Sequence, residues 1–88
     1  MPTKEKMPID EEKLKELMDQ VEHEFRRASA RYAEFASAHE GYAIIQEEAD
    51  ELWELVKTKG NGKQARAMHN ESVQIAAMAV RFMYDITG

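Results

Sequence analysis

The chain has 88 residues, 43% hydrophobic and 33% charged, with a formal net charge of −5 at pH 7, which is typical of a single helical domain. The negative charge argues against binding of nucleic acid through phosphate neutralisation, and the lack of cysteine excludes disulfides, thiolate metal ligands and thiol nucleophiles. No apolar run approaches the ~20 residues of a membrane span, and the first residues lack the apolar core of a signal peptide. We therefore expect a cytoplasmic protein without nucleic-acid or membrane partners.

The N-terminal segment, residues 1–8, is polar and ends at a proline, which predicts a disordered tail followed by one helical domain over residues 9–88. A first helix should begin near Ile9 or Asp10. Asp10 is a suitable N-cap, and the two glutamates that follow it favour the positive end of the helix dipole.

Apolar side chains then recur by threes and fours, which predicts a seam along one face of the first helix. The seam consists of Leu14, Met18, Val21, Phe25, Ala28, Tyr32, Phe35 and His39. Ser37 and Glu40 have the spacing of a capping box, so the chain is expected to start a new helix there. A continuous bent helix through His39 is the alternative.

The segment Gly41–Lys57 is predicted to form a second helix that carries acids among its apolar residues. At about 100° per residue, one stripe within about 60° contains Ile44, Glu48, Glu51 and Leu55. Carboxylates on a core-facing stripe need a counter-charge, and a bound hard cation supplies one. Surface glutamates on an amphipathic helix are the competing interpretation.

A third helix is predicted over Gln64–Ile86, where an acid again stands within an apolar row. The row consists of Met68, Glu71, Ile75, Met78 and Phe82. Between the two helices, Thr58–Lys63 is rich in glycine and asparagine, which favours an antiparallel helix hairpin.

In such a hairpin, acids at equal distances from the turn on the two helices should lie opposite each other. Counted outwards from Asn61, Glu51 and Glu71 are each ten residues away. Glu48 and Gln74 are each thirteen residues away, so the four side chains should meet at two levels about one turn apart.

The same residues resemble the motif of a known family. Glu47-Glu48-Ala49-Asp50-Glu51, followed after nineteen residues by Glu71-Ser72-Val73-Gln74, is similar to the EExxE…ExxD pattern of the MazG-like, all-α nucleoside triphosphate pyrophosphohydrolases. The resemblance covers about His39 to Ile86. It departs from the family pattern at Gln74, which replaces the final Asp and removes one negative ligand.

The resemblance implies an enzyme that cleaves a nucleoside triphosphate to a monophosphate and pyrophosphate, commonly to remove unwanted nucleotides. It implies Mg²⁺, with Mn²⁺ as a substitute, and the ligand set is Glu48, Glu51, Glu71 and Gln74. Glu47 is the first candidate for the base that takes a proton from the attacking water. Gln74 could instead hydrogen-bond a neighbouring carboxylate. A non-catalytic helical oligomer, or a nucleotide- or metal-binding module with a degenerate site, is the alternative, and Gln74 is its best support.

Three basic residues are candidates for substrate binding. Arg81 lies about 10 Å beyond Gln74 along the helix, where it could meet the far end of a triphosphate, and an ion pair with Asp85 is the alternative. His39 could contact the base or ribose, and Lys57 could attract phosphate. A structural turn histidine and a solubilising lysine are the plainer interpretations. A base pocket, or plain core, could come from Phe25, Tyr32 and Phe35.

Apolar residues cover more of the second and third helices than one chain can bury. On the second helix they are Tyr42, Ile45, Ala49, Leu52, Trp53 and Val56, and on the third they are Val73, Ala76, Ala77, Val80, Met83 and Tyr84. We therefore expect an all-α antiparallel bundle of about three helices per chain, completed by formation of a homodimer or homotetramer.

Overall fold

The computed structural model describes residues 6–58, 60 and 63–88, and all regular structure in this part of the chain is helical. The elements are α1 (Glu11–Arg31), α2 (Ala38–Lys57), α3 (Lys63–Phe82) and a closing π-helical turn, η1 (Met83–Thr87). The prediction of an all-α fold with three helices is confirmed. Residues 1–5 of the predicted tail, and residues 59, 61 and 62 of the predicted turn, lie outside the described residues.

The N-terminus of α1 follows its sequence signals. Asp10 is the N-cap, and its Oδ1 accepts a hydrogen bond of 3.0 Å from the backbone N–H of Lys13. Glu11 and Glu12 occupy the first turn, where the helix dipole favours negative charge. The predicted start of the first helix is therefore confirmed.

The prediction that a helical seam continues through His39 is wrong, because α1 ends at Arg31. The alternative of one continuous bent helix is wrong for the same reason. The chain leaves α1 at Tyr32 in an extended conformation and does not resume a helix until Ala38. Two side chains from the end of the chain hold this linker: Arg81 donates to the carbonyl of Ala33 at 2.8 Å, and Asp85 accepts from the N–H of Phe35 at 3.0 Å. These bonds satisfy backbone groups that a continuous helix would have paired internally.

The capping signal before α2 is present, with one change. Ser37 is the N-cap, and its hydroxyl accepts a hydrogen bond from the N–H of Glu40 at 3.1 Å. Glu40 reaches back as expected, but its carboxylate accepts from the N–H of Ala36 at 3.1 Å, one residue before the cap.

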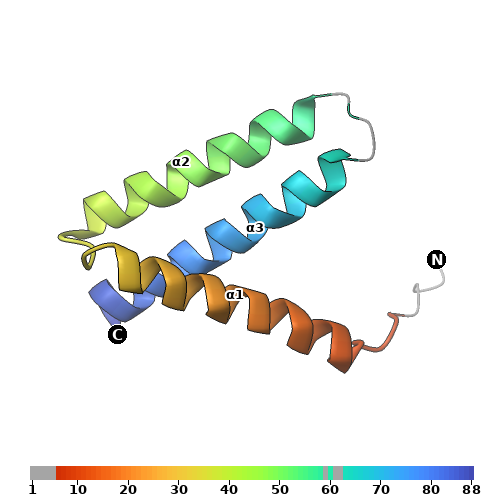
Figure 1. Cartoon of the computed structure of the whole chain (residues 1–88), viewed down its shortest axis with the longest axis horizontal. Helices are drawn as coiled ribbons and strands as arrows, with labels where there is room; N and C mark the ends of the chain where they lie inside the picture. The colour runs from red at the N-terminus through yellow and green to blue at the C-terminus, as the bar shows by residue number, and fades with distance from the viewer. Residues whose placement is uncertain (1–5, 59, 61–62) are drawn as a thin grey trace, which may run out of the picture.

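Each helix runs in roughly the opposite direction to the one before it (Figure 1). α2 and α3 form the antiparallel hairpin predicted from the sequence, and near its closed end the side-chain amide of Gln64 donates to the carbonyls of Leu55 and Thr58. α1 packs on α3 and runs in the same direction, so that α3 lies between α1 and α2. The first half of α1 projects away from the hairpin, and Met18 there is 56% exposed.

The core lies where the second half of α1 and the linker meet α3. Its buried hydrophobic residues are Ala28, Phe35, Ala77 and Met78. The half-buried residues packed against them are Val21, Phe25, Ile44, Ile45, Phe82 and Ile86. Gly41 permits close approach here, because a Cβ at this position would lie 2.6 Å from the Phe82 ring and 3.1 Å from the Phe35 ring.

Large apolar side chains remain exposed outside this core. Trp53 on α2 is 58% exposed and Tyr84 in η1 is 73% exposed. Tyr42, Val56 and Met83 are also exposed. None of the described helices combines the length and the apolar content that a membrane span requires.

Candidate functional site

Three carboxylates converge where α2 and α3 face each other. One carboxylate oxygen from each of Glu48, Glu51 and Glu71 lies within 4.8 Å of the other two. Among residues 6–58, 60 and 63–88 this is the one group of histidine, cysteine or acidic side chains spaced to share a metal ion. The prediction that these three acids meet is confirmed.

The hairpin geometry explains this convergence. Glu48 and Glu51 are three residues apart and share one face of α2, and Glu71 approaches from the antiparallel arm. Apolar neighbours on the same rows, including Ile44, Leu55 and Ile75, are half-buried and hold that face against the other arm. Glu48 and Glu71 are themselves half-buried, whereas Glu51 is exposed at the rim.

The proximity of like charges changes the protonation of the cluster. The carboxyl of Glu71 raises the pKa of Glu51, and the nearby charge of Glu47 adds to this effect. The pKa of Glu71 is raised by the neighbouring carboxyl of Glu48 and by burial. Without a counter-charge, these acids therefore retain protons to higher pH than isolated glutamates do.

The cluster fits a hard divalent cation. Three carboxylates within reach of one point match the oxygen ligands that Mg²⁺ and Mn²⁺ prefer. In addition, Oε1 of Glu71 is buried and has no hydrogen-bond partner in the part of the chain that the structure describes. Such an atom is costly in a protein interior, and a cation coordinated there would satisfy it.

Gln74 lies one turn beyond Glu71 and faces a carboxylate that the sequence interpretation missed. The pKa of the Glu24 carboxyl on α1 is lowered, mainly by Arg27, and the side chain of Gln74 contributes to this effect. Arg27 binds Glu24 with two bonds, from Nε at 2.8 Å and from Nη2 at 2.6 Å. The sequence does indicate that Glu24 faces the core, because it stands between the apolar positions Val21 and Ala28 at helical spacing.

A cavity of about 430 Å³ opens beside the acids, between the three helices and the linker. Its apolar wall includes Phe35, Ile44 and Met78, and polar groups reach it from each helix. The full lining is Glu24, Arg27, Ala28, Tyr32, Ala33, Phe35, Glu40, Ile44, Glu48, Gln74, Met78 and Arg81. Five of these twelve residues are charged, so the cavity combines a short apolar wall with a strongly polar edge, which suits a small polar molecule.

Arg81 stands at the end of this cavity and is only 4% exposed. Its guanidinium lies over the ring of Phe35, 4.4 Å from the centroid, and donates to the Ala33 carbonyl. Among the described residues, it forms no ion pair with Asp85, which was the alternative role considered for it. No described residue accepts a hydrogen bond from its buried Nε.

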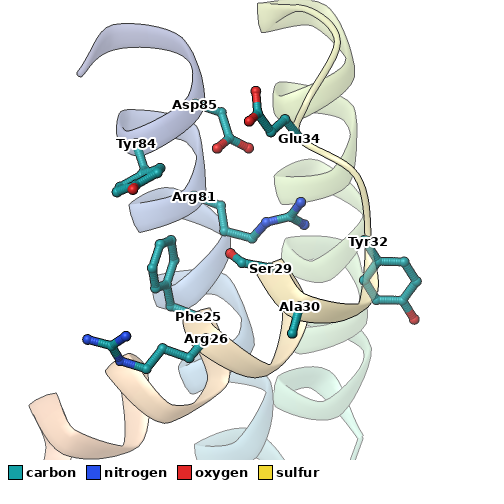
Figure 2. A pocket seen from close by; sticks show the side chains of 9 residues that line it. All are labelled: Phe25, Arg26, Ser29, Ala30, Tyr32, Glu34, Arg81, Tyr84 and Asp85. Atoms are coloured by element: carbon teal, nitrogen blue, oxygen red, sulfur yellow. The ribbon is translucent and has the colours of Figure 1, made fainter.

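A second cavity, of about 380 Å³, lies on the other side of Arg81 (Figure 2). It is lined by Phe25, Arg26, Ser29, Ala30, Tyr32, Glu34, Arg81, Tyr84 and Asp85. Phe25 and Tyr84 form one wall, with ring centroids 5.5 Å apart. None of the three clustered acids lines this cavity, so it is separate from the candidate metal centre.

The remaining predicted site residues lie at different distances from the cluster. Glu47 is exposed on α2 next to Glu48, and its charge acts on Glu51. His39 is exposed at the start of α2, where it lines a hollow with Tyr42 and Phe82. Lys57, at the other end of α2, pairs with Glu54 at 2.9 Å and lies 5.9 Å from the centroid of the Trp53 ring. The structure brings neither His39 nor Lys57 to the acids.

Comparisons of this chain with family models, with curated proteins and with solved structures find no match. Its function is therefore inferred from the geometry of the site and from the motif of acids.

Proposed function

We propose that this chain is a Mg²⁺-dependent pyrophosphohydrolase that converts nucleoside triphosphates to monophosphates and pyrophosphate, in the cytoplasm, as part of nucleotide housecleaning. The observation that carries the proposal is the convergence of Glu48, Glu51 and Glu71 within 4.8 Å, beside a cavity of suitable size. The motif resemblance supplies the class of reaction.

Glu48, Glu51 and Glu71 would hold the cation, with Gln74 as a neutral fourth ligand. When bound, Mg²⁺ or Mn²⁺ supplies positive charge to the phosphate oxygens and acidifies a water molecule. The buried Oε1 of Glu71 supports this assignment, because it has no hydrogen-bond partner among the described residues.

Glu47 is the proposed base. It stands beside Glu48 on the exposed side of the cluster, where a water molecule can reach its carboxylate. Its electrostatic effect on Glu51 places it near the other acids. A carboxylate in this position can accept the proton of the water that attacks phosphorus.

The cavity of about 430 Å³ is the proposed site for the nucleoside part of the substrate. Phe35, Ile44 and Met78 give it an apolar wall for a base, and Glu48 places it next to the cation site. Arg81 adds positive charge at its polar edge, where it would attract an anionic ligand, whereas the charge of Arg27 is balanced by Glu24.

The exposed apolar side chains of α2 and η1 support formation of a homodimer or homotetramer. The buried hydrophobic core of the described chain consists of four residues, while Trp53, Tyr84 and other large side chains face outwards. Packing of a second copy against these faces would bury them.

The direct test is incubation of the purified protein with MgCl₂ and a panel of canonical and modified nucleoside triphosphates. Phosphorus NMR distinguishes release of pyrophosphate from release of inorganic phosphate. We expect pyrophosphate and a monophosphate from at least one substrate, and loss of turnover with EDTA. Release of inorganic phosphate alone, or no turnover with any triphosphate, would contradict the proposed reaction.

One observation favours a second candidate, a non-catalytic nucleotide- or metal-binding module. Gln74, in place of the acid of the family pattern, interacts with Glu24. A binding module would show Mg²⁺-dependent binding of triphosphates in calorimetry and no product on long incubation. Restoration of the acid by Gln74→Asp would then be the variant that gains turnover.

A further inference from the structure

The cavity of about 380 Å³ beside Arg81 lies apart from the acids of the candidate metal centre, and its two sides differ in character. The rings of Phe25 and Tyr84 lie on one side of it (Figure 2). The charged groups, from Glu34, Arg81 and Asp85, lie on the other. Its volume is within the range of small-molecule sites, roughly 300–1,000 Å³.

The charged side holds a buried guanidinium that has no counter-ion. Arg81 is only 4% exposed, and no described residue accepts a hydrogen bond from its Nε. The Ala33 carbonyl and the face of the Phe35 ring offset part of the cost of burying its charge. No carboxylate among the described residues pairs with it. A carboxylate placed in the cavity would supply the missing counter-charge.

Two carboxylates on the same side of the cavity call for the opposite charge. Asp85 is half-buried and accepts from the N–H of Phe35 through Oδ2, and a carboxylate can accept from further donors. Glu34 is exposed at the rim. Neither acid forms an ion pair within the described chain. Arg26 also lines the cavity, but Glu22 balances its charge at 2.8 Å. The cavity therefore has places for one carboxylate and one ammonium group close together.

The aromatic side suits a flat apolar group. The ring centroids of Phe25 and Tyr84 are 5.5 Å apart, and the rings are tilted against each other by 59°. Aromatic rings favour tilted or offset contacts with one another, so a third ring could pack against this pair. Such a contact would also cover Tyr84, which is exposed.

We propose that this cavity binds a free aromatic α-amino acid, such as phenylalanine, tyrosine or tryptophan. Such a molecule carries its two charged groups at one end and its ring at the other, which matches the two sides of the cavity. Its carboxylate pairs with Arg81 and its ammonium group with Asp85, and Glu34 adds negative charge at the rim. The ring packs against Phe25 and Tyr84. The proposal does not depend on the metal centre or on the proposed reaction.

Backbone amide NMR titrations of the ¹⁵N-labelled, unmodified chain with L-phenylalanine, L-tyrosine and L-tryptophan test the proposal. We expect at least one of them to shift the signals of residues around Phe25, Arg81 and Tyr84 until they saturate. The α-amide of the tightest binder lacks the carboxylate, and its deaminated analogue lacks the ammonium group. Each should bind at least about 10-fold more weakly than the amino acid itself, because each loses a charge-assisted hydrogen bond.

Two variants assign the ends of the ligand. Asp85→Asn removes the charge but keeps an oxygen that can accept from the Phe35 N–H, so the fold should be retained while the affinity falls about 10-fold. Tyr84→Ala removes an exposed ring of the cavity and should also weaken binding about 10-fold. Tyr42→Ala is the matched control, because Tyr42 is exposed but does not line this cavity. It should leave the affinity within about 2-fold.

The proposal is overturned if none of the three amino acids causes saturable shifts up to its solubility limit, or if the shifts centre on another part of the chain. Equal binding of the amino acid, its amide and its deaminated analogue would overturn it as well, since the charged side would then contribute nothing. The same holds if Asp85→Asn and Tyr84→Ala bind as tightly as Tyr42→Ala. These titrations contain no metal ion and no triphosphate, so their outcome is independent of the proposed reaction.

Discussion

Glu51 on α2 and Glu71 on α3 bring carboxylate oxygens within 4.8 Å of each other across the helix hairpin. Neither has a cationic partner among the ion pairs of the described residues. Two like charges at this distance oppose each other unless a proton or a cation lies between them. The protonation of these two carboxyls therefore depends on pH, and a divalent ion between them is the counter-charge that we propose.

Replacement of Glu71 by glutamine should lower catalytic activity without lowering the stability of the fold. Glu71→Gln removes a proposed ligand and also relieves repulsion in the cluster. We therefore expect kcat/KM to fall by about 100-fold or more, with a melting temperature that is unchanged or higher. Pyrophosphate release and thermal denaturation measure the two effects.

The control for this variant is Glu54→Gln. Glu54 is exposed on α2 and pairs with Lys57, away from the cluster. Turnover should stay within about 2-fold of the unmodified protein, since exposed ion pairs contribute little. Loss of activity in both variants would indicate a general effect of charge on the hairpin of α2 and α3.

Stability in the absence of metal should fall as the pH rises. The pKa values of Glu51 and Glu71 are raised on folding, so over an interval of pH the folded chain holds more protons than the unfolded chain. In that interval the free energy of unfolding decreases with pH, and the decrease ends above the raised pKa values. Glu24 has the opposite effect on the free energy of unfolding at more acidic pH. Its pKa is lowered on folding, so the stability that its carboxylate contributes is lost as the pH falls through that lowered pKa.

Melting curves recorded between about pH 4 and about pH 8 measure this dependence. Glu71→Gln should flatten the decline, and saturating MnCl₂ should abolish it, because the cation replaces the shared protons. A decline of the same slope with and without Mn²⁺ would show that these acids do not bind the ion.

Gly41 should resist substitution although it lies within a helix. Alanine is the better helix former by about 1 kcal/mol, but its Cβ would lie 2.6 Å from the Phe82 ring. Overpacking costs about 1–3 kcal/mol, so we expect Gly41→Ala to lower the free energy of unfolding by about 1 kcal/mol. Urea denaturation measures the change. A more stable variant would mean that the Phe82 ring moves aside freely.

Charge on the outer face of α2 should disrupt self-association. Trp53→Glu places a carboxylate on the exposed apolar face, where a second copy would have to bury it. Light scattering after size exclusion should show an oligomer for the unmodified protein and a smaller species for the variant. Lys15→Glu, on the exposed first half of α1, should leave the mass unchanged. A monomer in every case would refute the predicted oligomer.

The hairpin and the meeting of its acids could be predicted because both depend on local rules. Helical periodicity places Glu48 and Glu51 on one face, and equal counts of residues on the two arms predict that Glu71 lies opposite them. No contact with a distant part of the chain is needed to derive either feature.

The end of α1 could not be predicted in this way. The apolar spacing continues through Phe35, and the break is stabilised by hydrogen bonds from Arg81 and Asp85, which are distant in sequence. The interaction of Glu24 with Gln74 depends on the packing of α1 against α3, and local periodicity does not give the register of that packing.

The most direct measurement of the central claim is the effect of Mn²⁺ on the backbone amide NMR signals of the full chain. The paramagnetic ion broadens signals of nearby nuclei, so substoichiometric MnCl₂ should first broaden those of residues around Glu48, Glu51 and Glu71. The same addition to Glu71→Gln should broaden them far less. Undisturbed signals, or broadening centred elsewhere on the chain, would contradict a cation site between α2 and α3.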